Sequence, residues 1–296
     1  MKSLFTKRFI IAVFIIAAFS AGLLVFFNLR ENNVPAPSAT ASPDRVQQPE
    51  KKVLGSSVEG RDINSHTFGK GKTRLVFVGG MHGGYEWNSV VLAYEFMDFL
   101  NANQEFIPEN LSITVIPSVN PDGVFKIIGK EGRFGVADVP VGGFKDAGRF
   151  NANAVDLNRN FDCKWKSKSM WRENQVSAGS RPFSEPESLA VRKFILDNKP
   201  AAVIFWHSQA NSVYASKCEA DILQETFDIM NAYSRASGYF ASNSFDSYEI
   251  TGDAADWLAS LGIPAITVEL KTHETIEWEK NLAGIGAIVK YYKDKN

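Results

Sequence analysis

Residues 75–88 read LVFVGGMHGGYEWN, and this stretch predicts both the fold class and the position of a functional site. Four apolar residues are followed by glycines and then by His82 and Glu86. A short apolar run that ends in glycines is typical of a buried strand, and open α/β sheets keep their ligands at the carboxyl ends of such strands. We therefore predict that His82 and Glu86 form half of a metal site. A hydrogen-bonded His–Glu pair without a metal is the alternative interpretation.

The composition is that of a globular protein. The chain has 296 residues, of which 45% are hydrophobic and 12% aromatic, enough to bury a full-sized core. The formal net charge is −1, but residues 1–30 contain Lys2, Lys7, Arg8 and Arg30 and no acid, so the rest of the chain carries a charge of −5. An acidic remainder argues against nucleic acid as a partner.

An uncharged apolar segment lies near the N-terminus, at residues 9–27 (FIIAVFIIAAFSAGLLVFF). Nineteen such residues are long enough to cross the hydrocarbon core of a bilayer, which is about 30 Å thick. Basic residues precede the segment, which places residues 1–8 in the cytoplasm and exports the rest of the chain. We predict a single-pass protein of the cell membrane with its globular part outside the cytoplasm. The alternative is a signal peptide, whose removal with residues 1–30 would release a secreted protein.

The composition changes after the apolar segment. Residues 28–50 are rich in Pro, Ser, Ala and Asn and contain almost nothing to bury. Such a segment is expected to be a flexible linker. We predict that it joins the anchor to one soluble domain at residues 51–296.

Within this domain, short apolar runs alternate with helical patterns. Ser184 and Glu187 have the spacing of a capping box and should open one of the helices. The expected strands lie at residues 74–79, 112–117, 201–206 and 263–270, and the expected helices at 87–103, 184–198, 219–238 and 278–292. The order predicts an α/β domain with a central, mixed, mostly parallel twisted sheet flanked by helices.

The interval 118–181 has little periodicity but many Gly, Asn, Asp and Arg residues. A long irregular segment in a compact domain is usually functional. It contains the tetrapeptide NPDG at residues 120–123, whose composition by itself predicts a tight turn.

His207 is the third candidate ligand, because it directly follows the apolar run 201–206 as His82 follows its own strand. Two His and one Glu form a ligand set that suits catalytic zinc, whose fourth position is kept for water. A buried core histidine is the alternative for position 207. His66 and His273 lie in polar surroundings, where we expect them to be solvated.

Eight motifs between residues 54 and 270 must be considered together. They are GSSVEGRDI at 55–63, GGMHGGYEWN at 79–88, NPDG at 120–123, VDLNRNF at 155–161, PFSEPES at 182–188, WHSQ at 206–209, YEITGDAADW at 248–257 and ITVEL at 266–270. In this order they resemble the zinc carboxypeptidase family typified by the pancreatic carboxypeptidases, and more closely its bacterial branches. Each motif is weak alone, but the ordered set is specific.

The resemblance implies a catalytic zinc site with one Zn²⁺ per chain. It gives His82, Glu86 and His207 as the zinc ligands. It gives Glu269 as the general base, which takes a proton from the attacking water and delivers it to the leaving amine. It also implies, through Arg149, an arginine that polarises the scissile carbonyl and stabilises the oxyanion.

The resemblance further implies a site for the terminal carboxylate of a peptide. Asn158 and Arg159 resemble the pair that grips this carboxylate, and Tyr248 resembles the mobile tyrosine that closes over it. Each residue also has a structural interpretation. Arg159 could form a surface ion pair with Asp156 or Asp162, Tyr248 could be ordinary loop packing, and Glu269 could cap a strand end.

The first motif departs from the family in its spacing. The family usually has H-x-x-E, whereas three residues separate His82 from Glu86 here. We expect the glycines to absorb the extra residue, and on a helix the i, i+4 pair would still share one face. The departure concerns the coordination geometry, and Glu86 stays the predicted ligand.

Specificity in the resembled enzymes depends on a pocket floor that lies several residues after the tyrosine. Ala255 occupies that position here, with Asp253 close by. Asp253 could receive an amino group, including that of a diamino acid in a cell-wall peptide. The alternative is that Asp253 caps a helix that begins near Gly252.

Cys163 and Cys218 are the only cysteines, and each follows a site motif by a few residues. Export would permit a disulfide, and one bridge between them is the preferred interpretation. Zinc ligation by the cysteines is the alternative.

Together these patterns predict a membrane-anchored zinc metallocarboxypeptidase acting on peptides with a free terminal carboxylate. Three rivals remain. The first is a carboxypeptidase or amidase of peptidoglycan stem peptides with the same mechanism. The second is a zinc deacylase of small N-acyl amino acids, and the third is an anchored binding module without activity.

Overall fold

The computed structural model describes residues 48–141 and 146–295. The predicted anchor at residues 9–27, and the predicted linker as far as residue 47, lie outside these ranges. Within the described ranges, no helix combines the length and the apolar character needed to cross a bilayer. The anchor, the linker and the orientation in the membrane therefore stay predictions.

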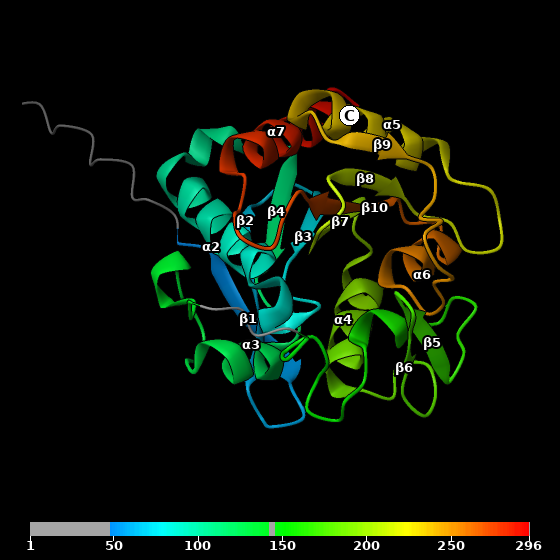
Figure 1. The fold of residues 1–296 in the computed structure, drawn as a ribbon. Helices are drawn as coiled ribbons and strands as arrows, with labels where there is room; N and C mark the ends of the chain where they lie inside the picture. Colours follow the sequence, from blue (N-terminus) through cyan, green and yellow to red (C-terminus); the bar gives the residue numbers. More distant parts are fainter. Residues whose placement is uncertain (1–47, 142–145, 296) are drawn as a thin grey trace, which may run out of the picture. The chain divides into compact units, whose positions relative to one another are not determined.

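A mixed sheet of eight strands organises the described residues (Figure 1). Across the sheet the strands are β1 (Glu50–Ser56), β2 (Asp62–Gly69), β4 (Leu111–Ile116), β3 (Thr73–Val78), β7 (Ala202–Ser208), β10 (Ala265–Leu270), β8 (Ser212–Ala215) and β9 (Phe240–Ser242). The four central strands β4, β3, β7 and β10 are parallel, as are β8 and β9. The other neighbouring pairs are antiparallel. The predicted α/β class with a mixed sheet is confirmed.

The central strands are buried on both faces, which explains their nearly continuous apolar sequences. Every residue of β4 and β7 is buried. Because successive side chains alternate between the faces of a sheet, Val76 and Phe77 of β3 contribute to two different clusters. Phe77 stacks on Trp206 at a centroid distance of 5.4 Å in one cluster, and Val76 joins Phe205 in the other.

Six helices cover the two faces in the described residues (Figure 1). They are α2 (Trp87–Ala102), α3 (Pro121–Ile128), α4 (Pro186–Asn198), α5 (Gln224–Ser237), α6 (Ala254–Ser260) and α7 (Trp278–Asp294). Helices α2, α5 and α7 pack on the Phe77 side through Phe96, Tyr233 and Ile285. Helices α4 and α6 pack on the opposite side, where Phe194 and Trp257 belong to the second cluster.

Two predictions about helix starts are wrong. Helix α4 begins at Pro186 with Glu185 as its N-cap, and the capping box does not form. Instead, the Ser184 hydroxyl donates to Glu185, and the Glu187 carboxylate accepts from the backbone N–H of Val58 at 3.1 Å. The Ser184 hydroxyl also accepts from the Asn160 side chain at 3.0 Å, so contacts outside the helix take both side chains. Helix α5 begins at Gln224 and not at residue 219.

The interval 118–181 is more regular than expected. NPDG does not form an isolated turn but starts α3, where the Asn120 side chain accepts from the backbone N–H of Gly123 at 2.8 Å. Later in the interval, β5 (Lys168–Trp171) and β6 (Asn174–Ser177) form a small hairpin. The hairpin was not predicted, because its strands are short and mostly polar.

A disulfide joins Cys163 to Cys218, with their Cα atoms 5.8 Å apart. It links the segment after the VDLNRNF motif to the segment after β8. The bridge closes a loop with a sequence separation of 55 residues. Crosslinks of this kind stabilise a protein mainly by restricting the unfolded chain.

We expect the double variant C163A/C218A to lose about 2–4 kcal/mol of unfolding free energy, because the unfolded chain regains the entropy that the crosslink removes. Urea denaturation of the protein and the variant measures this loss. As a control, a reductant should lower the unfolding midpoint of the unmodified protein but not that of the variant. Equal unfolding free energies for the two proteins would contradict a structural role of the bridge.

Candidate active site

The candidate site lies at the carboxyl ends of the parallel strands β3, β7 and β10. His82 follows β3 by four residues, and His207 is the sixth residue of β7. In the parallel pairing of β7 with β10, Glu269 lies directly beside His207. The strand register therefore brings these three residues together at the carboxyl ends of adjacent strands, although they are far apart in the sequence.

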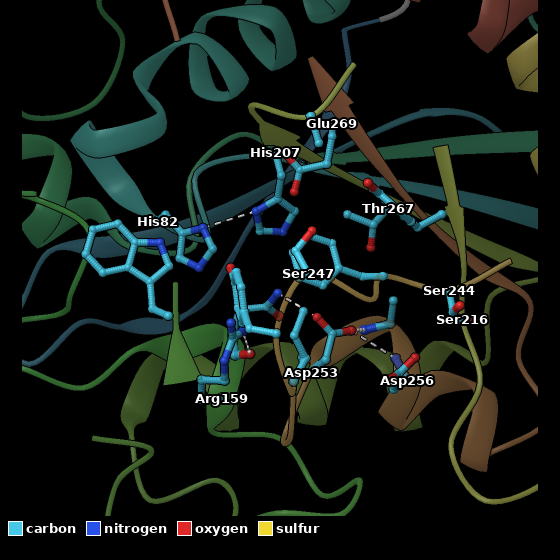
Figure 2. Close-up of a pocket in the computed structure, with 18 of the residues that line it drawn as sticks. His82, Arg159, His207, Ser216, Ser244, Ser247, Asp253, Asp256, Thr267 and Glu269 are labelled. Atoms are coloured by element: carbon cyan, nitrogen blue, oxygen red, sulfur yellow. Dashed lines mark hydrogen bonds between the residues drawn. The ribbon is translucent and has the colours of Figure 1, made fainter. Parts of the chain in front are cut away.

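His82, Glu86 and His207 converge on one point (Figure 2 labels both histidines). One Glu86 oxygen lies 2.8 Å from Nδ1 of His82, and the other lies 2.8 Å from Nδ1 of His207. The two Nδ1 atoms are 3.1 Å apart. One donor atom from each residue lies within 4.8 Å of the others, and all three side chains are buried.

The chemistry of this donor set fits zinc. Two imidazoles and one carboxylate are a common set for catalytic zinc. Zinc-ligating histidines usually have their second ring nitrogen held by a carboxylate or carbonyl. Here the other ring nitrogen of His82, Nε2, lies 3.2 Å from Oδ1 of the buried Asp156. That contact leaves Nδ1 of His82 facing Glu86 and His207.

The glycines of the first motif form a tight turn between His82 and Glu86. The short 3₁₀ helix η1 (Gly83–Glu86) carries the chain from His82 to Glu86 and lies against α3. Gly83 has φ +48°, and a Cβ there would come within 2.6 Å of the Gly148 carbonyl oxygen. A Cβ on Gly84 would come within 2.5 Å of the Ile127 side chain. Only residues without a side chain permit this close approach.

Opposite charges surround the buried Glu86. Burial alone would raise the pKa of Glu86, but the neighbouring His82 and His207 hold it well below its usual value. Burial alone would likewise raise the pKa of Asp156, but the charges of Arg149, Arg159 and His82 together outweigh burial and keep it well below its usual range. Arg149 donates to Asp156 at 2.8 Å and lies 3.7 Å from Glu86. The site thus keeps two carboxylates ionised in a buried position.

Glu269 faces the donor set with a free oxygen. Its Oε2 is buried and has no hydrogen-bond partner in the described part of the chain. Burial, and then the charge of Glu86, raise the pKa of Glu269 to about 7. A carboxylate with this pKa and an open lone pair can accept a proton near neutral pH.

Ten of the predicted site residues line one cavity of about 440 Å³. They are His82, Glu86, Arg149, Asn158, Arg159, His207, Tyr248, Asp253, Ala255 and Glu269. The remaining two, Cys163 and Cys218, form the disulfide, so zinc ligation by the cysteines is not what the structure shows. The structure therefore brings together, in one cavity, residues that were predicted from short motifs far apart in the sequence.

Backbone carbonyl oxygens hold the Arg159 guanidinium in place at the wall of the cavity. Arg159 is only 2% exposed, and its guanidinium donates to the carbonyl oxygens of Met170 at 3.1 Å and of Asn158 at 2.7 Å. The surface ion pair considered from the sequence does not form. Tyr248 is half-buried and packs edge-on against Phe245 at a centroid distance of 4.8 Å.

Asp253 caps helix α6. Its carboxylate accepts from the backbone N–H groups of Ala255 at 2.8 Å and Asp256 at 3.1 Å, and from the Asn158 side chain at 2.6 Å. The capping interpretation is therefore what the structure shows. Ala255 is buried within the core cluster that contains Trp257. Asp256 also lines the cavity and does not cap the helix; it was not among the predicted site residues.

His273 is not simply solvated, as was expected from its polar surroundings. Its Nδ1 lies 2.6 Å from the Ser208 hydroxyl, and its ring packs against Tyr85 at a centroid distance of 4.6 Å. Burial lowers the pKa of His273. Local sequence could not predict these contacts of His273, because Ser208 and Tyr85 come from distant segments.

The chain is similar in sequence to known bacterial proteins. The chain is 27% identical over 241 residues to a γ-D-glutamyl-L-diamino acid endopeptidase of Lysinibacillus sphaericus, covering 73% of this chain and 59% of that protein. It is 27% identical over 157 residues to murein peptide amidase A of Escherichia coli (strain K12), covering 49% and 60%. The chain spans about half the length of the curated relatives it matches.

The fold also matches solved structures. The structure of thrombin activatable fibrinolysis inhibitor matches with a TM-score of 0.67 at 21% identity, over 84% of this chain and 70% of that one. The family model described as zinc carboxypeptidase matches residues 39–284. Because that match covers most of the sequence, including every residue of the donor set, this chain belongs to the zinc carboxypeptidase family.

Proposed function

We propose that this protein is a zinc-dependent metallocarboxypeptidase that hydrolyses the C-terminal bond of peptides. One observation carries the proposal. His82, Glu86 and His207 converge beside the free oxygen of Glu269, in a cavity that also contains Arg159. Metal ligands, a base and a cation for a terminal carboxylate are the groups that hydrolysis at a chain end requires.

His82, Glu86 and His207 would hold one Zn²⁺ per chain. Zinc in such a site lowers the pKa of a water molecule and polarises a carbonyl group. The buried Asp156 fixes the orientation of the His82 ring, and Arg149 in turn neutralises Asp156. These outer contacts keep the donor atoms in place before metal or substrate binds.

The chain's own residues then have separate tasks in the reaction. The free oxygen of Glu269 accepts a proton from the attacking water, and the same carboxyl group delivers it to the leaving amine. The Arg149 guanidinium, 3.7 Å from Glu86, provides positive charge near the scissile carbonyl. Asn158 and Arg159 hold the terminal carboxylate, and Tyr248 closes over it.

A second candidate function keeps this mechanism and changes the substrate. The similarity to a γ-D-glutamyl-L-diamino acid endopeptidase and to a murein peptide amidase supports peptides of the cell wall as substrates. Release of C-terminal residues from purified muropeptides, compared with a panel of ordinary peptides, separates the two candidates. A deacylase of N-acyl amino acids would instead process acyl amino acids and leave peptides intact.

We also propose where the protein works. Residues 9–27 would anchor it in the cell membrane, residues 1–8 would lie in the cytoplasm, and a linker at 28–50 would carry the domain at 51–296 outside. The disulfide between Cys163 and Cys218 supports an oxidising compartment.

Replacing the proposed base tests the mechanism directly. The variant E269Q should lose about 10²–10⁴-fold in kcat, because glutamine keeps the shape of glutamate but cannot accept the proton. Steady-state kinetics with a peptide substrate measures the loss, and zinc content should stay at one per chain. Activity within a factor of about three of the unmodified protein would exclude Glu269 as the base.

Removing a ligand tests the metal site. We expect H207A to lose zinc, as measured by elemental analysis after dialysis, and to lose peptide hydrolysis with it, since a His₂Glu site needs all three donors. A chelator should inactivate the unmodified protein, and added zinc should restore it. H66A is the matched control, because His66 lies on β2 outside the donor set, and it should keep one zinc. Full zinc occupancy in H207A would refute the assignment.

A further inference from the structure

One cluster of hydrogen-bonded side chains near the site has no part in the mechanism described above. It consists of Asn88, Ser208 and His273. Asn88 lies two residues after the predicted ligand Glu86, and Ser208 lies directly after the predicted ligand His207. His273 lies four residues after the proposed base. The cluster therefore links the three chain segments that carry two of the ligands and the base.

Asn88 connects helix α2 to the segment that follows β10. Its side chain is fully buried, and its amide nitrogen donates to the carbonyl oxygens of Thr272 at 2.7 Å and Thr275 at 3.0 Å. Because a carbonyl oxygen can only accept, these two bonds fix which end of the amide is the nitrogen. The amide oxygen accepts from the Ser208 hydroxyl at 3.0 Å. Both amide hydrogens of Asn88 thus hold the segment after β10.

The direction of the bond between Ser208 and His273 follows from these contacts. Nδ1 of His273 lies 2.6 Å from the Ser208 hydroxyl oxygen, and the hydroxyl has only one hydrogen to donate. Donating it to His273 would leave the buried Asn88 oxygen without a donor. It would also place the hydrogen of a neutral ring on Nε2, which is buried and has no partner within residues 48–141 and 146–295. A buried donor without a partner is costly, so Nδ1 of His273 donates to Ser208.

The hydrogen bonds of the cluster form a closed circuit. His273 donates to Ser208, Ser208 donates to Asn88, and Asn88 donates to the carbonyl oxygens on either side of His273. The circuit starts and ends in residues 272–275, which belong to neither a helix nor a strand. Side-chain contacts therefore fix this irregular segment against α2 and β7.

The position of Glu269 depends on the same segment. Glu269 is the fifth of the six residues of β10, and the pairing of β10 with β7 ends one residue later, at Leu270 opposite Ser208. The end of an element opens easily unless further contacts hold it. No hydrogen bond holds the buried Oε2 of Glu269 in the described part of the chain. The backbone at the end of β10 must therefore hold the carboxylate in place.

We propose that Asn88 and His273 are positioning residues that act through Ser208 to keep Glu269 in place beside the donor set. Neither Asn88 nor His273 lines the cavity, so neither touches a substrate there. The donor set has a separate support, the contact of His82 with Asp156. Loss of the cluster should therefore affect the base and not the binding of zinc. The inference rests on the proposed function and adds to it the residues that hold the base.

The first test removes the link to the segment after β10. We expect N88A to lower kcat about 10–100-fold, the usual effect of losing such a supporting contact. KM should change by less than about threefold, because the groups that bind the terminal carboxylate are untouched. Elemental analysis should still find one zinc per chain. N103A is the matched control on the same helix, because Asn103 donates to the Phe99 carbonyl oxygen at the far end of α2; it should keep kcat.

The second test separates the hydrogen bond of His273 from its packing. The side-chain nitrogen of asparagine lies as many bonds from Cα as Nδ1 of histidine, whereas that of glutamine lies as many bonds away as Nε2. H273N can therefore still donate to Ser208, and H273Q cannot donate from the same place. We expect H273Q to lose about 10–100-fold in kcat and H273N to stay within about threefold of the unmodified protein. A role in filling space beside Tyr85 would instead favour glutamine, the larger side chain.

A third measurement asks whether the cluster acts through Glu269. In the E269Q background, adding N88A should lower the remaining kcat by less than about threefold, because the base that Asn88 positions is already absent. An equal loss with and without E269Q, or loss of zinc in N88A, would overturn the inference. Equal kcat values for H273N and H273Q would overturn it as well, even if N88A does not fold. An unmodified zinc-loaded protein that hydrolyses no peptide would instead contradict the proposed function, and the inference with it.

Discussion

The parallel pairing of β3, β7 and β10 is the constraint on which the rest of the structure depends. It places the carboxyl ends of three strands next to one another, and the register puts Glu269 beside His207. A shift of one residue in this register would turn every side chain of the shifted strand to the opposite face. The apolar residues of these strands fix the register by packing into two separate clusters. Core packing thereby decides the relative positions of the predicted ligands and the proposed base.

Burying so many charged groups would destabilise the fold if they were not paired. The site contains Glu86, Asp156 and Arg149, each at most 2% exposed, together with two buried histidines. Each carboxylate has a positive or polar partner at hydrogen-bond distance. An unpaired buried charge costs several kcal/mol, so the pairing within this network offsets that cost as well as orienting the donors. Within the part of the chain that the structure describes, one buried Glu269 oxygen has no hydrogen-bond partner, and Glu269 is the residue proposed to accept a proton.

The two ends of the cavity are built differently. The end with the donor set rests on strand ends and on the tight η1 turn, whose glycines allow a close approach to α3. The end with Asp256 rests on α6 and on two segments crosslinked by the disulfide. Rigid strands suit chemistry that depends on small distances, whereas loops tolerate sequence change and suit substrate selection. This division is consistent with relatives that are named for different activities, an endopeptidase and an amidase.

The sequence by itself determined the α/β class, the central strands, and the donors at the carboxyl ends of two of them, because apolar runs and strand-end histidines are local signals. It indicated the disulfide as the preferred arrangement of its two cysteines, but geometry was needed to show them within reach. Only the tertiary structure decided which partner each polar side chain takes. Glu187 contacts Val58 and not its own helix start, and Asp253 caps α6 while Asp256 faces the cavity. These partners depend on contacts between distant segments, which the spacing of residues within a motif does not predict.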